Sequence, residues 1–233
     1  MFCQHCGAQT ADDLQFCTNC GQALTPAALK TLVPFEPKTR GEVRIWHWYS
    51  AGWNIVTQDT ATFALIALLF VILNGVPFMH GPLLVGMHLA IMRKMMLGRV
   101  EVGDFFKGFN YLLPALIAGV IVAMLVGFGF VLCIIPGLVL AGMYCFTWIF
   151  IADKNMDFWP AMEASHAVVK LNGYFNFVLF VLAGVLVNLV GALCCLVGLL
   201  ITIPATYAAI TVAYEELVGF EKHGEEFGTL PSV

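Results

Sequence analysis

Charged side chains are scarce in this sequence. Asp, Glu, Lys and Arg together make up 11% of the 233 residues, whereas a soluble domain usually carries about 25%. Hydrophobic residues make up 60% of the chain, and they gather in long runs between Thr60 and Ala152 and between Tyr174 and Tyr214. Runs of roughly 18 or more apolar residues are typical of membrane-spanning helices. The composition therefore indicates an integral membrane protein.

The sequence also lacks an excess of positive charge. Its formal net charge is −4, so it has no basic surface of the kind that binds nucleic acid, and we expect no nucleic-acid partner. The first thirty residues are polar and contain no basic segment followed by an apolar one. We therefore expect no cleavable signal peptide, with the first membrane span serving as the targeting signal.

Enzyme signatures are missing as well. There is no H-E-x-x-H, no G-x-S-x-G and no pair of aspartates within the expected spans, so we expect no enzymatic activity. Polar residues inside spans are the usual functional candidates, and here they are few, with His88 and Asn188 the main ones. We expect Asn188 to hydrogen-bond between helices rather than to bind a substrate. His80 and His88 roughly share a helix face, but we expect a turn residue and a hydrogen-bonded core residue rather than a functional pair.

The eight cysteines form two groups. Four lie in apolar surroundings without ligand spacing, and we expect them to be small packing residues: Cys133, Cys145, Cys194 and Cys195. The other four form C-x2-C, a ten-residue spacer and C-x2-C, with a glycine after each pair: Cys3, Cys6, Cys17 and Cys20. Two thiolates at this spacing can face one tetrahedral ion, so the four cysteines predict a closed, structural Zn²⁺ site.

The cysteine-bearing head resembles the short zinc ribbons found at the N-termini of many bacterial and archaeal membrane and regulatory proteins. The alternative of two disulfides is disfavoured because a head that stays in the cytosol is reduced. Since four cysteines complete the site, we expect His5 to be exposed. A segment of this size has too small an apolar core, so zinc binding would supply its folding free energy.

The sequence divides into four parts. We assign residues 1–24 to the zinc ribbon, 25–41 to a proline-containing linker, 42–217 to a helical transmembrane domain and 218–233 to a cytosolic C-terminal tail. We expect an all-α polytopic membrane protein with about six transmembrane helices, arranged as three hairpins with interfacial helices. The expected spans are 60–78, 81–97, 112–134, 137–153, 174–194 and 197–216. The second could instead be a re-entrant or tilted segment, because it is short and ends near Arg93 and Lys94.

Loop charge predicts the orientation. Lys and Arg occur before the first span and in the loops near residues 93–107 and 154–170, whereas the alternate turns at 74–81, 133–137 and 194–198 carry neither. The positive-inside rule then places both termini in the cytosol, in a multi-pass protein of the cytoplasmic (inner) membrane. A reduced zinc ribbon is consistent with that placement.

A polar and aromatic segment precedes each predicted hairpin, at 43–59, 102–111 and 157–173. We interpret these segments as interfacial helices. In the last one, Glu163 and Lys170 fall on a polar stripe, and Met162 and Val169 on an apolar stripe. Small residues at four-residue spacing in three spans indicate close helix packing within one bundle. A surface for homo-oligomerisation is the less favoured interpretation.

The chain from Gly52 onward resembles a broad group of prokaryotic integral membrane proteins of uncharacterised function. That group is related to the membrane domain accompanying some glycerophosphoryl diester phosphodiesterases. The resemblance rests on Gly52-Trp53-Asn54-Ile55-Val56, on Gly81-Pro82-Leu83 with Val102-Gly103-Asp104-Phe105-Phe106-Lys107-Gly108-Phe109, and on the tract from Ala161 to Glu215. It implies a multi-helix membrane fold. No phosphodiesterase domain is present, so that activity does not carry over.

Two functions stay open at this level. The first is a non-enzymatic membrane scaffold or adaptor, whose cytosolic ribbon engages a protein partner and whose helices act as an anchor in the lipid bilayer. The second is a transporter or channel for a lipid or small apolar molecule, which broken spans near Gly75-Val76-Pro77 and Pro82 would support. A cavity reaching His88 or Asn188 would favour transport, and a solid bundle would favour the scaffold.

Overall fold

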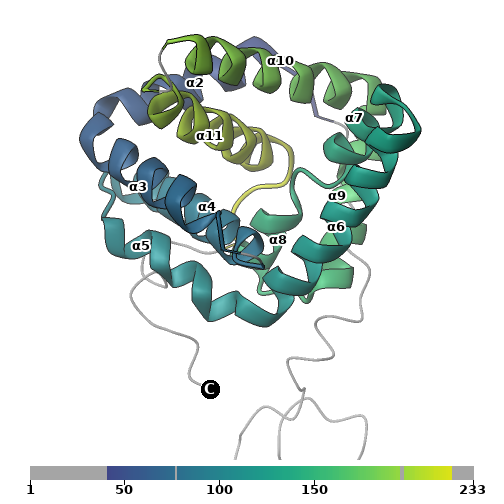
Figure 1. Ribbon diagram of the computed structural model, residues 1–233, viewed down its shortest axis with the longest axis horizontal. Coiled ribbons are helices and arrows are strands. Elements are labelled where there is room, and N and C mark those ends of the chain that lie inside the picture. The colour runs from purple at the N-terminus through teal and green to yellow at the C-terminus, as the bar shows by residue number, and fades with distance from the viewer. Residues whose placement is uncertain (1–40, 77, 195–196, 222–233) are drawn as a thin grey trace, which may run out of the picture. The chain divides into compact units, whose positions relative to one another are not determined.

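The structure is a computed structural model that describes residues 41–76, 78–194 and 197–221. The predicted ribbon, most of the linker and most of the C-terminal tail lie outside these residues. Within them the chain is helical and has no strand (Figure 1). The helices are α2 (Ile45–Gln58), α3 (Thr60–Leu73), α4 (His80–Leu97), α5 (Val102–Phe106), the 3₁₀ helix η1 (Lys107–Tyr111), α6 (Leu112–Leu132), α7 (Ile134–Met143), α8 (Thr147–Lys154), α9 (Phe158–Asn172), α10 (Tyr174–Leu193) and α11 (Leu199–Leu217).

Three helical segments in the described part are long and apolar enough to cross a membrane: Val102–Leu132, Ile134–Lys154 and Tyr174–Leu193. A fourth is added if α2 and α3, which meet at 102°, form one broken span. The predicted count of six is therefore not confirmed. The expected spans 81–97 and 197–216 do form helices, α4 and α11, but neither meets this criterion of length and apolarity.

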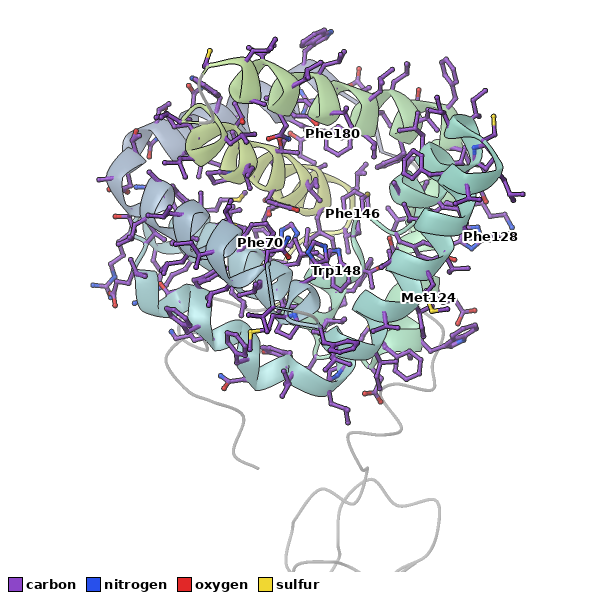
Figure 2. The ribbon with its side chains drawn as sticks, viewed as in Figure 1. Phe70, Met124, Phe128, Phe146, Trp148 and Phe180 are labelled. Atoms are coloured by element: carbon purple, nitrogen blue, oxygen red, sulfur yellow. The ribbon has the colours of Figure 1, made fainter. Side chains whose placement is uncertain are left out.

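The two helices that miss the criterion are largely covered by other helices. Helix α4 is buried without interruption from Gly81 to Met92, and α11 crosses the middle of the view in Figure 1. By contrast, Met124 and Phe128 of α6 are 70% and 64% exposed (Figure 2). Neighbouring helices cover much of α4 and α11, so His88, Thr211 and Tyr214 are buried in protein, and the apolar surface that lipid requires falls to α6 and α10.

Glycines allow the segment from Val102 to Tyr111 to lie directly on α4. A Cβ atom placed on Gly108 would come within 2.2 Å of the Pro82 carbonyl oxygen, and one on Gly86 within 1.9 Å of the Phe105 carbonyl oxygen. The two backbones therefore touch, with no room for a side chain between them. This contact fixes α5 and η1 against α4.

The α3–α4 hairpin ends beside the first turns of α6. A Cβ atom on Gly81 would lie 2.0 Å from the Ala115 carbonyl oxygen, and one on Gly119 would lie 3.4 Å from the Gly81 Cα atom. Since Arg93 at the other end of α4 pairs with Asp104, the chain from Asp104 to Gly119 runs antiparallel to α4. The rest of α6 continues past the start of α4.

Helices α6 and α7 form the predicted antiparallel hairpin, but the reversal is earlier than predicted. The break is the single extended residue Cys133, with φ −171° and ψ 158°, and α7 starts at Ile134. Pro136 lies in the first turn of α7, where a backbone N–H would have no helical partner, so proline is tolerated there. The predicted span 137–153 is interrupted between α7 and α8.

Helix α9 matches the predicted amphipathic segment. It covers Phe158–Asn172, and it has Met162 and Val169 buried and Glu163 and Lys170 exposed. Its apolar face packs on the neighbouring helices, where the Ser165 hydroxyl donates to the Met143 carbonyl oxygen at 2.7 Å. Asp157 occupies the N-cap position but makes no capping hydrogen bond through its side chain.

Charged residues of the described chain fall in four segments, 42–59, 93–107, 153–170 and 215–221. Ion pairs connect these segments across long distances in sequence: Arg44 with Glu216 at 3.0 Å, Lys94 with Asp59, and Lys154 with Glu221 at 3.2 Å. Glu216 also accepts the Trp48 indole N–H at 2.7 Å. The four segments are therefore joined by direct contacts.

Candidate functional site

The predicted zinc ligands, Cys3, Cys6, Cys17 and Cys20, lie outside the described residues. Among the residues that the structure does describe, no group of three His, Cys, Asp or Glu could hold a metal ion. Cys145 is buried, as expected for a packing residue. Cys133 and Cys194 are exposed at chain reversals, so the prediction that they pack inside was wrong, and Cys195 is not described.

A cavity of about 660 Å³ lies within the helical domain and is partly open. It forms beyond the tip of the α3–α4 hairpin, where α6 and α7 continue opposite α10 and α11. Its lining from the described residues is Tyr49, Phe70, Asn74, His80, Leu84, Gly119, Val122, Ala123, Val126, Ala141, Tyr144, Cys145, Trp148, Phe180, Val181, Gly184, Val185, Asn188, Ile203, Thr206, Tyr207 and Ile210.

The lining is mainly aliphatic and aromatic. Figure 2 shows Phe70, Trp148 and Phe180, from α3, α8 and α10, directed toward the interior of the domain. No Asp, Glu, Lys or Arg occurs among the described lining residues. A volume of this size is typical of pockets for small organic ligands, which are mostly apolar with a few placed polar groups. The cavity is therefore suited to an apolar molecule.

One predicted candidate, Asn188, lines this cavity. Its amide nitrogen donates to the Gly184 carbonyl oxygen and to the Thr206 hydroxyl, both at 2.9 Å, so it joins α10 to α11 as expected. Its Oδ1 atom is buried and has no hydrogen-bond partner among the described residues. Asn188 therefore joins two helices of the cavity wall through its amide nitrogen and keeps one acceptor atom without a partner among the described residues.

The other candidate, His88, lies outside the cavity lining. It is fully buried, its Nδ1 atom lies 2.9 Å from the Thr211 hydroxyl, and its ring meets Tyr207 edge-on. His80, in contrast, borders the cavity and lies 2.8 Å from Asn74 through its Nδ1 atom. The two histidines have different partners and do not form one site.

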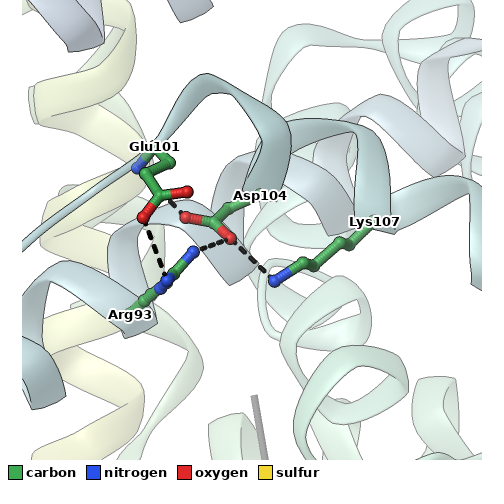
Figure 3. Close-up of polar contacts among 4 residues, drawn as sticks. All are labelled: Arg93, Glu101, Asp104 and Lys107. Atoms are coloured by element: carbon green, nitrogen blue, oxygen red, sulfur yellow. Dashed lines mark hydrogen bonds and ion pairs between the residues drawn. The ribbon is translucent and has the colours of Figure 1, made fainter. Parts of the chain in front are cut away.

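A polar cluster surrounds Asp104 at the far end of α4 from the cavity (Figure 3). The carboxylate is 2% exposed, pairs with Arg93 and with Lys107 at 2.9 Å, and accepts the Glu101 backbone N–H at 3.0 Å. Arg93 also pairs with Glu101 at 3.2 Å. Each charged group has an opposite partner, so the cluster holds α5 against α4 and offers no free charge to a ligand.

Comparison with known proteins bears mainly on the N-terminus. Residues 2–24 match the zinc-ribbon domain, so the chain carries a zinc ribbon there, and membership of that domain implies zinc binding. Two uncharacterized proteins, one from Mycobacterium bovis and one from Mycobacterium tuberculosis, are each 33% identical over 120 residues. The match covers 52% of this chain but only 36% of each relative's length. No solved structure matches the chain.

These matches do not show a relationship to the phosphodiesterase membrane domain. The cavity itself had only faint signals in the sequence. Asn74 and His80 flank an interrupted apolar run, and Gly119 and Ala123 belong to a stripe of small residues. Nothing in their spacing places α3, α6, α10 and α11 around a common space, because that arrangement depends on contacts between distant segments.

Proposed function

We propose that this chain is a non-enzymatic integral membrane protein whose helical domain binds a lipid or other small apolar molecule in the cavity. The observation that carries the proposal is the cavity of about 660 Å³ with its uncharged, mainly apolar lining. A domain that served only as an anchor would be expected to have a solid core. The cavity also reaches Asn188, which is the feature expected of the transport or binding function rather than of the scaffold.

Packing energetics support an occupant. An empty apolar space carries a free-energy penalty, because the atoms that line it lose packing contacts. The cavity is partly open, so a molecule from the surroundings can enter it. Water is a poor occupant, because it needs two to four polar partners and the walls offer few. An apolar molecule removes the penalty by restoring contacts.

The proposed topology has three hairpins, α3–α4, α6 with α7 and α8, and α10–α11. Each hairpin begins and ends on the side of the domain that carries the four charged segments. The ion pairs between Arg44 and Glu216 and between Lys94 and Asp59 support a common side for the hairpin ends. Full crossing by all three gives six spans. If the α3–α4 hairpin is re-entrant, both termini still lie on the same side. The positive-inside rule makes that side the cytosol of a cytoplasmic membrane protein.

The zinc ribbon is proposed to be structural and to engage a protein partner in the cytosol. Four thiolates leave no open coordination position for catalysis. A pull-down with the intact protein and with Cys3→Ser tests the partner. Proteins lost only with Cys3→Ser support the role, and an identical set from both variants contradicts it.

Binding in the cavity is tested with two neighbouring substitutions on α6. Ala123 lines the cavity, whereas Met124 is 70% exposed on the outside. The full-length protein is purified in mild detergent, and co-purifying lipid is measured by native mass spectrometry for Ala123→Trp and Met124→Trp. Loss of a stoichiometric apolar molecule only in Ala123→Trp supports the proposal. No bound molecule in the parent protein, or equal retention in both variants, contradicts it.

A further inference from the structure

We infer that the cavity selects an amphipathic molecule with an uncharged, hydrogen-bonding head, such as a long-chain alcohol or acylglycerol, and that Asn74 and His80 recognise this head. The inference rests on the proposed function and narrows its ligand class. It is drawn from the hydrogen-bonded pair of Asn74 and His80 at the tip of the α3–α4 hairpin, which borders the cavity.

The pair is placed by the fold. Asn74 follows α3 and His80 begins α4, so the two side chains come together where the hairpin reverses, and both border the cavity. Rings from two further elements flank His80, with Phe70 at 6.2 Å and Trp148 at 6.4 Å between ring centroids. The head group would therefore meet a polar pair held in an aromatic setting.

Hydrogen-bond chemistry defines what the pair can recognise. The Asn74 Oδ1 atom can only accept, so the His80 Nδ1 atom 2.8 Å away must be the donor. In neutral imidazole the Nε2 atom is then an acceptor, and the Asn74 amide nitrogen still has hydrogens to donate. Neither side chain makes another hydrogen bond among the described residues. One acceptor beside one donor matches a hydroxyl group, which both gives and receives a hydrogen bond.

Charge selects against other amphiphiles. No side chain of formal charge occurs in the described lining, so a phosphate, carboxylate or quaternary ammonium head would find no partner of opposite charge there. The hydrocarbon part has the remaining lining available, including Val122, Val126, Val185 and Ile203. The walls therefore accept the chain, while the hairpin tip accepts an uncharged head.

The test uses four probes with the same sixteen-carbon chain: the alcohol, its methyl ether, the alkyl sulfate and the alkyltrimethylammonium. Each competes with a bromine-labelled alcohol that quenches tryptophan fluorescence, in full-length protein purified in mild detergent. We expect the alcohol to bind about three- to tenfold more tightly than the ether, the ratio for one lost hydrogen bond. We expect both charged probes to bind more weakly than the ether.

Variants separate this inference from the proposed function. His80→Leu and Asn74→Leu should bind the ether normally and lose the preference for the alcohol, while His47→Leu, a histidine outside the lining, should keep it. Ala123→Trp should weaken all four probes. No binding of any probe overturns both proposals. Binding with no alcohol preference, with a preference for a charged head, or with a preference that survives His80→Leu and Asn74→Leu overturns this inference alone.

Discussion

The glycine contact between α4 and the following segment makes a quantitative prediction, because two glycines five residues apart differ completely in their surroundings. A Cβ atom on Gly108 would lie 2.2 Å from the Pro82 carbonyl oxygen and 2.4 Å from the Gly86 nitrogen, whereas one on Gly103 would meet nothing within 4 Å. Gly108→Ala and Gly103→Ala therefore add the same methyl group to one short segment. Only the first forces two backbones apart.

The two substitutions should change the free energy of unfolding in opposite directions. Non-bonded contact needs roughly 3.5 Å, so Gly108→Ala requires the two backbones to separate by about 1 Å. Backbone atoms, unlike a side chain, cannot move aside by changing rotamer. Overpacking of this kind costs about 3 kcal/mol or more. Gly103→Ala, within α5, should instead gain about 0.5–1 kcal/mol by restricting the unfolded chain and improving helix propensity.

The assay is thermal unfolding of the purified protein in detergent. For a chain of this size 1 kcal/mol corresponds to about 2–4 °C, so Gly108→Ala should lower the Tm by about 6–12 °C, while Gly103→Ala should raise it slightly. Gly86→Ala should lower the Tm about as much as Gly108→Ala. The double variant should lose less stability than the sum of the two single variants, since both substitutions separate the same two backbones. Equal Tm values for Gly103→Ala and Gly108→Ala would refute the reasoning.

Four further outcomes are expected. Met162→Asp should lower thermal stability far more than Glu163→Ala, because only Met162 lies on the buried face of α9; equal Tm values would contradict that facing. Asp104→Ala should cost about 3–5 kcal/mol by removing the buried partner of Arg93 and Lys107, and Arg93→Met combined with Asp104→Leu should recover most of it in a denaturant titration; additive losses would exclude the coupling. With the other cysteines of the helical domain replaced, Cys133 should react with an impermeant maleimide from outside intact cells, and reaction only after lysis would invert the topology. Elemental analysis should find one zinc per chain, lost on Cys3→Ser without unfolding the helices; protein purified without chelator and free of metal would remove the assigned site of Cys3, Cys6, Cys17 and Cys20.

Local patterns in the sequence predicted the individual helices well. The stripe containing Met162 and Val169 placed the buried face of α9 correctly, because helical periodicity alone decides which side chains share a face. The antiparallel arrangement of α6 and α7 was also predictable from a short apolar turn. The position of the break differs from the one predicted between spans 112–134 and 137–153, because the chain reverses through the extended backbone of Cys133.

The other features depend on contacts between residues far apart in the sequence, which the sequence alone does not predict. Arg93 and Lys94 argued against a conventional span in 81–97, yet their partners Asp104 and Asp59 are apparent only once α4 has folded against its neighbours. The burial of α4 on all sides, which explains how it tolerates His88, likewise depends on helices far along the chain. The cavity was not predictable, since its lining comes from segments that lie far apart in the sequence, from Tyr49 to Ile210.

The attachment of α2 to α11 links the cavity wall to the point where the linker leaves the helical domain. Tyr207 and Thr206 line the cavity on α11, and nine residues or so further along the same helix Glu216 holds both Trp48 and Arg44. Gly41, the last residue of the assigned linker and the first that the structure describes, donates its N–H to the Asn172 side chain at 2.9 Å. One helix, α11, therefore both lines the cavity and holds α2, the first helix that follows the linker.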